Sequence, residues 1–128
     1  MKHLLIIDDD PVSVLILKKM LVNAGFLENP IVFYNGSDAL AFFSQSNTTN
    51  EIYYVFLDIN MPEMNGWEFL DLFKENLSNE FSQTKVIILS STIDPSDYQK
   101  AKQYEMVSHF LSKPITVEML QNLKPLYS

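Results

Sequence analysis

The chain has 128 residues, with 16 acidic and 9 basic side chains and therefore a net charge of −7 at pH 7. All nine basic residues are lysines, a composition that counts against binding to duplex nucleic acid or to an anionic membrane surface. The absence of cysteine excludes disulfides, thiolate nucleophiles and cysteine-ligated zinc, while 47% hydrophobic and 20% charged residues are typical of a folded domain.

Length and hydropathy predict one domain over residues 1–128. No run approaches the ~18 consecutive apolar residues of a membrane span. The first apolar run, Leu4–Ile7, ends after four residues at three aspartates, which makes it too short for the core of a signal peptide. We therefore expect a soluble, cytoplasmic protein with a single hydrophobic core.

The first predicted strand, Leu4–Ile7, is followed by a predicted helix. Asp10 supplies a capping carboxylate, Pro11 suits the first helical position, and Gly25 suits the helix end. Apolar residues recur at helical spacing and predict the buried face, namely Val14, Leu17 and Leu21, widened by Leu15 and Met20.

The middle of the chain repeats this alternation. Strands are predicted at Ile31–Tyr34 and Tyr53–Leu57, because both runs are apolar and rich in β-branched and aromatic residues. A helix after Gly36 is marked by Ala39, Leu40 and Phe43. Another helix, after Gly66, is marked by Trp67, Phe69, Leu70, Phe73 and Leu77. The most loop-like segment lies between them, at Ser44–Asn50.

The last third predicts strands at Val86–Leu89 and Phe110–Leu111. Between them, Asp94–Glu105 begins with another capping carboxylate before a proline, and its few apolar residues predict a helix with one solvated face. A final helix is marked by Val117, Leu120 and Leu123. Five strands alternating with five helices predict an α/β fold, a doubly wound parallel sheet whose ligand crevice lies at the strand C-termini.

Polar residues follow these strands in order. The first strand ends in Asp8-Asp9-Asp10, the third in Asp58, the fourth in Ser90-Ser91 and the fifth in Ser112-Lys113-Pro114. Clustered carboxylates repel one another and favour a hard cation, and an all-oxygen set with few ligands suits Mg²⁺. A lysine and a hydroxyl beside the cation suit a tetrahedral anion. The pattern predicts a Mg²⁺ site that presents a phosphoryl group to one aspartate nucleophile.

Each residue also has an ordinary structural interpretation. Asp10 is better explained as a helix cap than as a metal ligand. Asp8 and Asp9 can be solvated turn acids, Ser90 can cap the next helix, and Lys113 can be a surface lysine. The functional interpretation depends on their placement on successive strand ends.

Four segments, LLIIDDDP, FLDINMPEMNG, VIILSS and FLSKP, make the whole chain similar to the response-regulator receiver domain of two-component signalling, in its stand-alone, chemotaxis-regulator form. The resemblance implies a flavodoxin-like five-stranded parallel sheet of order 2-1-3-4-5 with five helices. It also implies Mg²⁺ as cofactor and a sensor histidine kinase or histidine phosphotransfer protein as phosphodonor.

The resemblance assigns roles to individual residues. It implies Asp58 as phosphoacceptor, Asp9 as a direct Mg²⁺ ligand, Asp8 as a ligand through water, and Asn60 as a ligand through its backbone carbonyl. Ser90 would bond the phosphoryl group and Phe110 would be the switch aromatic. Lys113 matches the invariant lysine, followed by a Lys–Pro bond that is usually cis.

Phosphorylation would switch the face formed by the fourth helix, fifth strand and fifth helix, which contacts an unknown downstream protein. Only 15 residues follow Lys113, which predicts no output domain. The resemblance further implies a monomer or a phosphorylation-dependent dimer and no enzyme activity beyond the domain's own phosphorylation and dephosphorylation.

The sequence departs from the family pattern in three places. Met106-Val107 replaces a common Gly-Ala, so the sequence does not determine where the fourth helix ends. Phe110 lacks the hydroxyl of the commoner tyrosine. Lys74–Thr84 is longer than the minimal pattern and predicts an extended loop before the fourth strand.

Two other functions fit part of the sequence. Asp8-Asp9-Asp10-Pro11-Val12 also matches the start of haloacid-dehalogenase-like phosphohydrolases, but only Glu118 follows Lys113 as a downstream acid, and that family does not explain the Asp58 segment. A receiver-like interaction module without phosphorylation is the other alternative. Nothing in the sequence favours it, because Asp8, Asp9, Asp58, Ser90 and Lys113 are all present.

Overall fold

The computed structural model describes residues 2–45, 51–77, 81, 83–91 and 94–127. Strands and helices alternate along the chain, as the sequence predicts. Their bounds are β1 (Lys2–Ile7), α1 (Pro11–Asn23), β2 (Ile31–Phe33), α2 (Gly36–Gln45), β3 (Ile52–Asp58), α3 (Gly66–Asn76), β4 (Lys85–Ser90), α4 (Pro95–Ala101), β5 (Val107–Ser112) and α5 (Val117–Tyr127).

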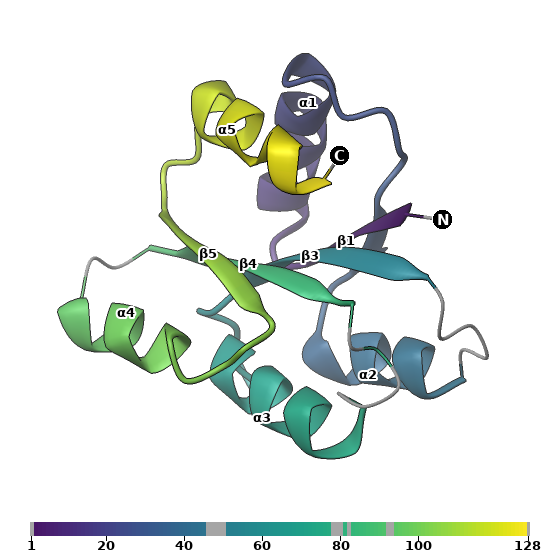
Figure 1. The fold of residues 1–128 in the computed structure, drawn as a ribbon, viewed down its shortest axis with the longest axis vertical. Coiled ribbons are helices and arrows are strands. Elements are labelled where there is room, and N and C mark those ends of the chain that lie inside the picture. The colour runs from purple at the N-terminus through teal and green to yellow at the C-terminus, as the bar shows by residue number, and fades with distance from the viewer. Residues whose placement is uncertain (1, 46–50, 78–80, 82, 92–93, 128) are drawn as a thin grey trace.

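The five strands form one parallel sheet in the order β2-β1-β3-β4-β5, which confirms the predicted topology. Helices α1 and α5 cover one face of the sheet, and α2, α3 and α4 cover the other (Figure 1). Since all strands run the same way, their C-terminal ends share one edge of the sheet. None of the helices in the described ranges has the length and apolar character needed to cross a bilayer.

Burial is greatest in the central strands. Leu4–Ile7 of β1 are at most 1% exposed, and residues 53–58 of β3 are buried as well. The strands at the sheet edges are less buried, because β2 is half-buried and β5 exposes Ser108 and His109. The sheet therefore separates two apolar layers, each closed by its own set of helices.

The predicted caps are present at α1 and α4. The Asp10 carboxylate accepts a hydrogen bond from the backbone N–H of Val12 at 3.0 Å, and Asp94 accepts one from Ser96 at 2.9 Å. The cap of α3 is Asn65, which exchanges hydrogen bonds with Glu68 in a capping box. These caps satisfy free backbone N–H groups and fix where each helix leaves the functional edge of the sheet.

Two predicted helix features are wrong. Leu15 does not widen the buried stripe of α1, since its side chain is 55% exposed. Helix α4 ends at Ala101 instead of continuing to Glu105, so Met106-Val107 lies beyond it, and Met106 accepts a hydrogen bond from the Val86 N–H at 2.8 Å. No glycine is required there because, among the described non-glycine residues, only Glu63 has a positive φ.

The segment before β4 contributes to the core. Phe81 is 2% exposed, and its ring centroid lies 5.1 Å from Phe43 of α2 and 5.7 Å from Tyr53 of β3. Helix α3 ends at Asn76, and the remainder of the predicted loop includes residues 78–80 and 82, outside the described residues. Within the other predicted loop, Ser44 and Gln45 belong to α2, and residues 46–50 are also outside the described residues.

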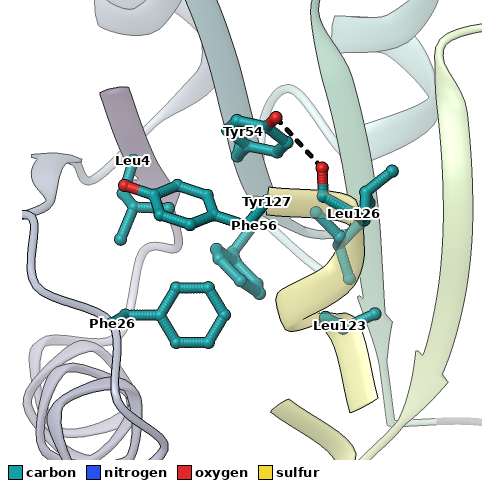
Figure 2. Close-up of a pocket in the computed structure, with 8 residues that line it drawn as sticks. Leu4, Phe26, Tyr54, Phe56, Leu123, Leu126 and Tyr127 are labelled. Atoms are coloured by element: carbon teal, nitrogen blue, oxygen red, sulfur yellow. Dashed lines mark hydrogen bonds between the residues drawn. The ribbon is translucent and has the colours of Figure 1, made fainter. Parts of the chain in front are cut away.

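The C-terminal end of α5 packs against the face of the sheet that carries α1. The ring of Tyr127 lies 5.1 Å from Phe26 and 4.8 Å from Tyr54. The Tyr54 hydroxyl donates a hydrogen bond to the Leu126 carbonyl at 3.1 Å, next to a small apolar cavity (Figure 2). Lys2 completes the contact with its ammonium 5.4 Å from the Tyr127 ring centroid, so the two ends of the chain stabilise one another.

Replacing Tyr127 tests this contact. We expect Tyr127→Ala to lower the free energy of unfolding by about 2 kcal/mol, because it removes a ring packed between two aromatic side chains. Urea denaturation followed by circular dichroism measures the change. Tyr34→Ala is the matched control, since Tyr34 is 49% exposed, and its effect should stay within about 0.5 kcal/mol. Equal effects of the two substitutions would contradict the packing role.

Candidate functional site

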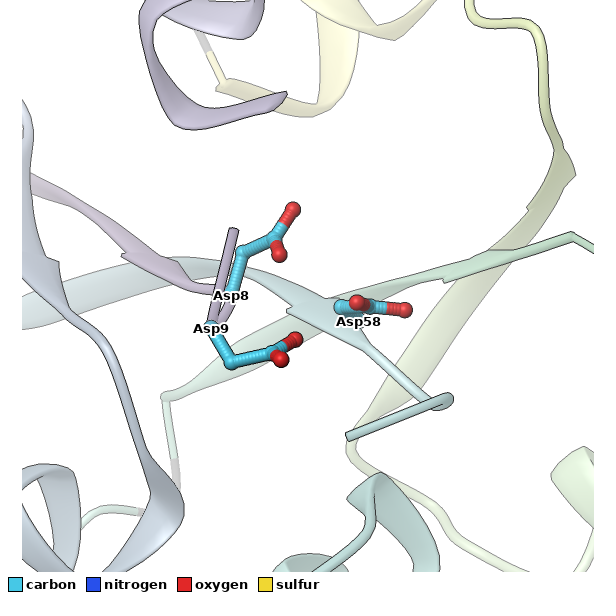
Figure 3. Close-up of side chains that lie close together, drawn as sticks. All are labelled: Asp8, Asp9 and Asp58. Atoms are coloured by element: carbon cyan, nitrogen blue, oxygen red, sulfur yellow. The ribbon is translucent and has the colours of Figure 1, made fainter. Parts of the chain in front are cut away.

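Three carboxylates meet at the C-terminal edge of β1 and β3. One oxygen from each of Asp8, Asp9 and Asp58 lies within 4.8 Å of the others (Figure 3). The register explains this, because Ile7 of β1 pairs with Leu57 of β3, so Asp8 and Asp58 follow at the same height. Asp8 is 2% and Asp58 3% exposed, whereas Asp9 is exposed. The site combines two buried acids with one acid open to solvent.

Hydrogen bonds hold the two buried carboxylates in place. Asp8 Oδ1 accepts from the Asp10 N–H at 3.0 Å, and Asp58 Oδ1 accepts from the Asn60 N–H at 3.0 Å. Lys113 Nζ lies 3.7 Å from Asp58 Oδ1, an ion-pair distance. The acceptor carboxylate predicted from the sequence therefore has a fixed orientation and one cationic neighbour.

Burial raises the pKa of Asp8 to about 6, and the nearby negative charge of Asp58 adds to the increase. The Asp10 N–H and the Lys113 ammonium oppose the shift without cancelling it. Three acids and one lysine leave an excess of negative charge within a few ångströms. The donor set is all oxygen, with one ligand facing solvent, and this is the chemistry that suits a hard divalent cation such as Mg²⁺.

Lys113 and Ser90 are held together by the ends of β4 and β5. Ser90 is 0% exposed and pairs with Ser112 in the sheet. Its carbonyl accepts a hydrogen bond from the Lys113 N–H at 2.7 Å, and the Lys113-Pro114 peptide is cis. The fourth and fifth strands thus deliver the predicted hydroxyl and ammonium to the edge that carries Asp58.

A contact between Asn60 and Ser91 was not predicted. The Asn60 side-chain oxygen accepts hydrogen bonds from both the N–H and the hydroxyl of Ser91, at 3.2 and 3.0 Å. It joins the loop after β3 to the loop after β4. The doubled serine after the fourth strand was the available signal, but the sequence could not show that the second serine faces Asn60.

Gly66, at the start of α3, packs tightly against the end of β3. A Cβ atom at this position would lie 2.8 Å from Ile59 Cα and 3.1 Å from the Asp58 carbonyl oxygen, so only glycine fits. The next residue, Trp67, stacks on Tyr104 with ring centroids 5.9 Å apart, and the Lys100 ammonium lies 5.0 Å from the Trp67 ring. The first turn of α3 is therefore in contact with α4.

A further contact fastens α3 to the segment that follows α4. The Tyr104 hydroxyl donates a 2.6 Å hydrogen bond to the Asp71 carboxylate. Burial, together with this carboxylate, raises the pKa of Tyr104 to about 12, so the donor stays protonated at neutral pH.

Phe110 lies apart from the acidic cluster. Its half-buried ring makes an edge-to-face contact with Tyr98 of α4, at 5.9 Å between centroids. Tyr98 is 50% exposed and has the Lys102 ammonium 4.9 Å from its ring. The predicted switch aromatic therefore lies on β5 and contacts an exposed tyrosine of α4.

A cavity of about 260 Å³ opens beside the site between α1 and the loop that follows β5. Asp8 and Lys113 form its polar end. Its apolar wall includes Ile16, Leu17, Met20, Pro114 and Ile115. The cavity is therefore continuous with the carboxylate cluster.

The raised pKa of Asp8 predicts that, without metal, this carboxylate makes the folded protein less stable as the pH rises. Because the folded-state pKa is about 6 against an ordinary 3.8, the folded state binds the proton more tightly, and this stabilisation is complete below pH 3.8 and lost as pH rises through 6. In EDTA at pH 7.5, we expect Asp8→Asn to raise the free energy of unfolding by about 2–3 kcal/mol, measured by urea denaturation. The gain should vanish near pH 4. Equal stability of the variant and the wild type at pH 7.5 would contradict the prediction.

Comparison with known proteins agrees with this geometry. The family model of the response regulator receiver domain matches residues 4–123. Hybrid signal transduction histidine kinase L of Dictyostelium discoideum is 32% identical over 112 residues, which cover 87% of this chain and 6% of the kinase. Hybrid signal transduction histidine kinase C of the same organism is 30% identical, over 92% of this chain and 9% of its own length. The chain therefore spans a small part of these relatives.

Solved structures give the same result. A two-component response regulator from Cytophaga hutchinsonii has a TM-score of 0.84 and 29% identity, covering 98% of this chain and 96% of its own. Chemotaxis protein CheY4 from Vibrio cholerae has a TM-score of 0.76 and 25% identity, with coverage of 99% and 97%. The match of the receiver family model to residues 4–123 favours the receiver over the phosphohydrolase alternative. With the five strands in the expected order and the acids at the expected edge, the chain belongs to the response regulator receiver domain family.

Proposed function

We propose that this receiver accepts a phosphoryl group on Asp58 from a phosphohistidine of a sensor kinase or histidine phosphotransfer protein. The observation that carries the proposal is the environment of Asp58, a 3%-exposed carboxylate beside Asp8 and Asp9 with the Lys113 ammonium at 3.7 Å. A structural acid would not require two further carboxylates and a lysine at the same strand edge. The receiver is a signalling domain whose only chemistry is its own phosphorylation and dephosphorylation.

In the transfer, an Asp58 carboxylate oxygen attacks phosphorus. The P–N bond breaks, and its electron pair remains on the imidazole of the donor. In dephosphorylation, water attacks phosphorus, the bond to the Asp58 oxygen breaks, and inorganic phosphate leaves. Lys113 neutralises charge on the transferred group, and the Asn60 N–H keeps the carboxylate oriented.

The residues that would hold Mg²⁺ are Asp9 and Asp58 directly, Asp8 through water, and Asn60 through its backbone carbonyl. The oxygen-only donors and the excess negative charge support this assignment. When bound, the ion supplies charge stabilisation to phosphoryl oxygens.

Phosphorylation would then be read on the α4–β5–α5 face. Ser90, fully buried at the end of β4, would bond the phosphoryl group, and Phe110 would change its packing against Tyr98. Exposed Tyr98, Ser108 and His109 lie on this face and are available to a downstream protein. A two-state change of this face biased by phosphorylation is the proposed output, in the monomer or through a phosphorylation-dependent dimer.

We also propose that the donor docks on α1. Four of its apolar residues, Val12, Leu15, Ile16 and Val22, are 53–69% exposed. The only charges on the helix are Lys18 and Lys19, so it offers an apolar, weakly basic surface in an acidic protein. The adjoining cavity leads to Asp8 and Lys113, so a helical donor seated on α1 would have its histidine beside the acceptor.

A further proposal concerns the cellular context of the receiver. Its location is cytoplasmic, because a kinase-charged donor requires ATP. The acetyl phosphate experiment below distinguishes a phosphorylated receiver from a receiver-like interaction module that is not phosphorylated.

Acetyl phosphate and Mg²⁺ test the acceptor. We expect intact-mass spectrometry to show one added phosphoryl group on the wild type and none on Asp58→Asn, since an amide oxygen is a poor nucleophile. Asp38→Asn is the matched control, because Asp38 is exposed in the first turn of α2, and it should label like the wild type. Removing Mg²⁺ with EDTA should also abolish labelling. Labelling of Asp58→Asn, or a wild type that never labels, would overturn the proposal.

Donor-specific kinetics test the α1 surface. We expect Leu15→Glu to slow phosphoryl transfer from an autophosphorylated histidine kinase at least tenfold, because a charge replaces an apolar contact. Labelling by acetyl phosphate, which does not dock on α1, should continue at the wild-type rate. Leu27→Glu is the control, since Leu27 is 93% exposed in the loop beyond α1 and should not affect either donor. Equal loss with both donors would refute docking on α1.

A further inference from the structure

Asn60 contacts both the acceptor and the neighbouring loop. Its backbone N–H donates to Asp58 Oδ1 at 3.0 Å, while its side-chain oxygen accepts from the N–H and hydroxyl of Ser91 at 3.2 and 3.0 Å. Asn60 therefore contacts both the carboxylate that would carry the phosphoryl group and the two hydrogen-bond donors of Ser91. The Ser91 donors lie at the C-terminal end of β4, directly after Ser90, which is on the same sheet edge as Asp58.

From this arrangement we infer that the Asn60 side chain competes with the phosphoryl group of Asp58 for the donors of Ser91. The inference rests on the proposed function. A phosphoryl group presents anionic oxygens, and charge-assisted hydrogen bonds are about twice as strong as those to a neutral amide oxygen. Phosphorylation therefore displaces Asn60 from Ser91, and Asn60 is a positioning residue that sets how favourably the phosphorylated arrangement forms.

A purely structural role fits the contact poorly. Asn60 and Ser91 are both exposed, so their contact lies outside the packed core and contributes to folding only the modest net value of a hydrogen bond. The contacts that hold the acceptor loop to the fold come from other groups, including the Gly66 N–H, which donates to the Ile59 carbonyl at 3.0 Å. An alanine at position 60 retains the backbone N–H on Asp58 and the backbone carbonyl, and it removes only the competitor.

Beryllofluoride, which binds an aspartate carboxylate as a phosphoryl analogue, is the probe. We expect Asn60→Ala to bind beryllofluoride in excess Mg²⁺ about fivefold more tightly than the wild type, the factor that one typical hydrogen bond supplies. Asn60→Asp should bind it more weakly than the wild type, because a carboxylate holds the Ser91 donors more strongly. Mg²⁺ affinity is also measured on each variant without beryllofluoride, which distinguishes a change in ion binding from a change in beryllofluoride binding. Asn29→Ala, an exposed asparagine before β2, is the matched control and should stay within twofold.

The backbone amide resonance of Ser91 gives a readout that a structural role would not change. In the free protein we expect this resonance to differ between wild type and Asn60→Ala. With beryllofluoride bound the two should converge, because no side chain at position 60 then contacts Ser91 in either protein. Unchanged beryllofluoride affinity in Asn60→Ala, or resonances that stay apart, would overturn the inference while leaving the proposed function intact. A wild type that binds no beryllofluoride would instead overturn the proposed function.

Discussion

The structure depends on two carboxylates that are buried side by side at the edge of a parallel sheet. Asp8 and Asp58 cannot both be charged there at low cost, because burial and mutual repulsion act in the same direction. Lys113 and the backbone N–H groups of Asp10 and Asn60 each reduce that cost in part. The fold therefore holds a local excess of negative charge that a divalent cation can offset.

Much of this arrangement could be predicted from the sequence because it follows from topology. Parallel strands bring their C-terminal ends together, so Asp8, Asp58 and Lys113 had to converge once the strands were identified. The exposure of Leu15 could not be predicted, since α1 is apolar on nearly every side and periodicity alone does not distinguish the buried face from a docking face. The Asn60–Ser91 contact was missed for a different reason, because it joins two loops through side-chain orientation.

The helices around the site are coupled to it unequally. On one face of the sheet, α1 leaves the acidic cluster directly after its Asp10 cap and adjoins the cavity beside the acceptor. On the other face, β3 packs against Gly66 at the start of α3, and the neighbouring Trp67 contacts Lys100 of α4. Tyr104 fastens the segment that follows α4 to α3. The C-terminal end of α4 is therefore anchored, while Tyr98 on the same helix is half-exposed beside Phe110. Motion of this helix would be largest away from its anchor.

The position of Trp67 has a practical consequence. It is the only tryptophan in the sequence, and it lies in the first turn of α3, with its ring stacked on Tyr104 and the Lys100 ammonium of α4 at 5.0 Å. Indole emission responds to the charge and polarity around the ring, so a rearrangement of α4 relative to α3 would change the intrinsic fluorescence of the unlabelled protein. Trp67 is therefore an internal optical reporter, and rapid-mixing experiments can use it to follow the proposed response to phosphorylation.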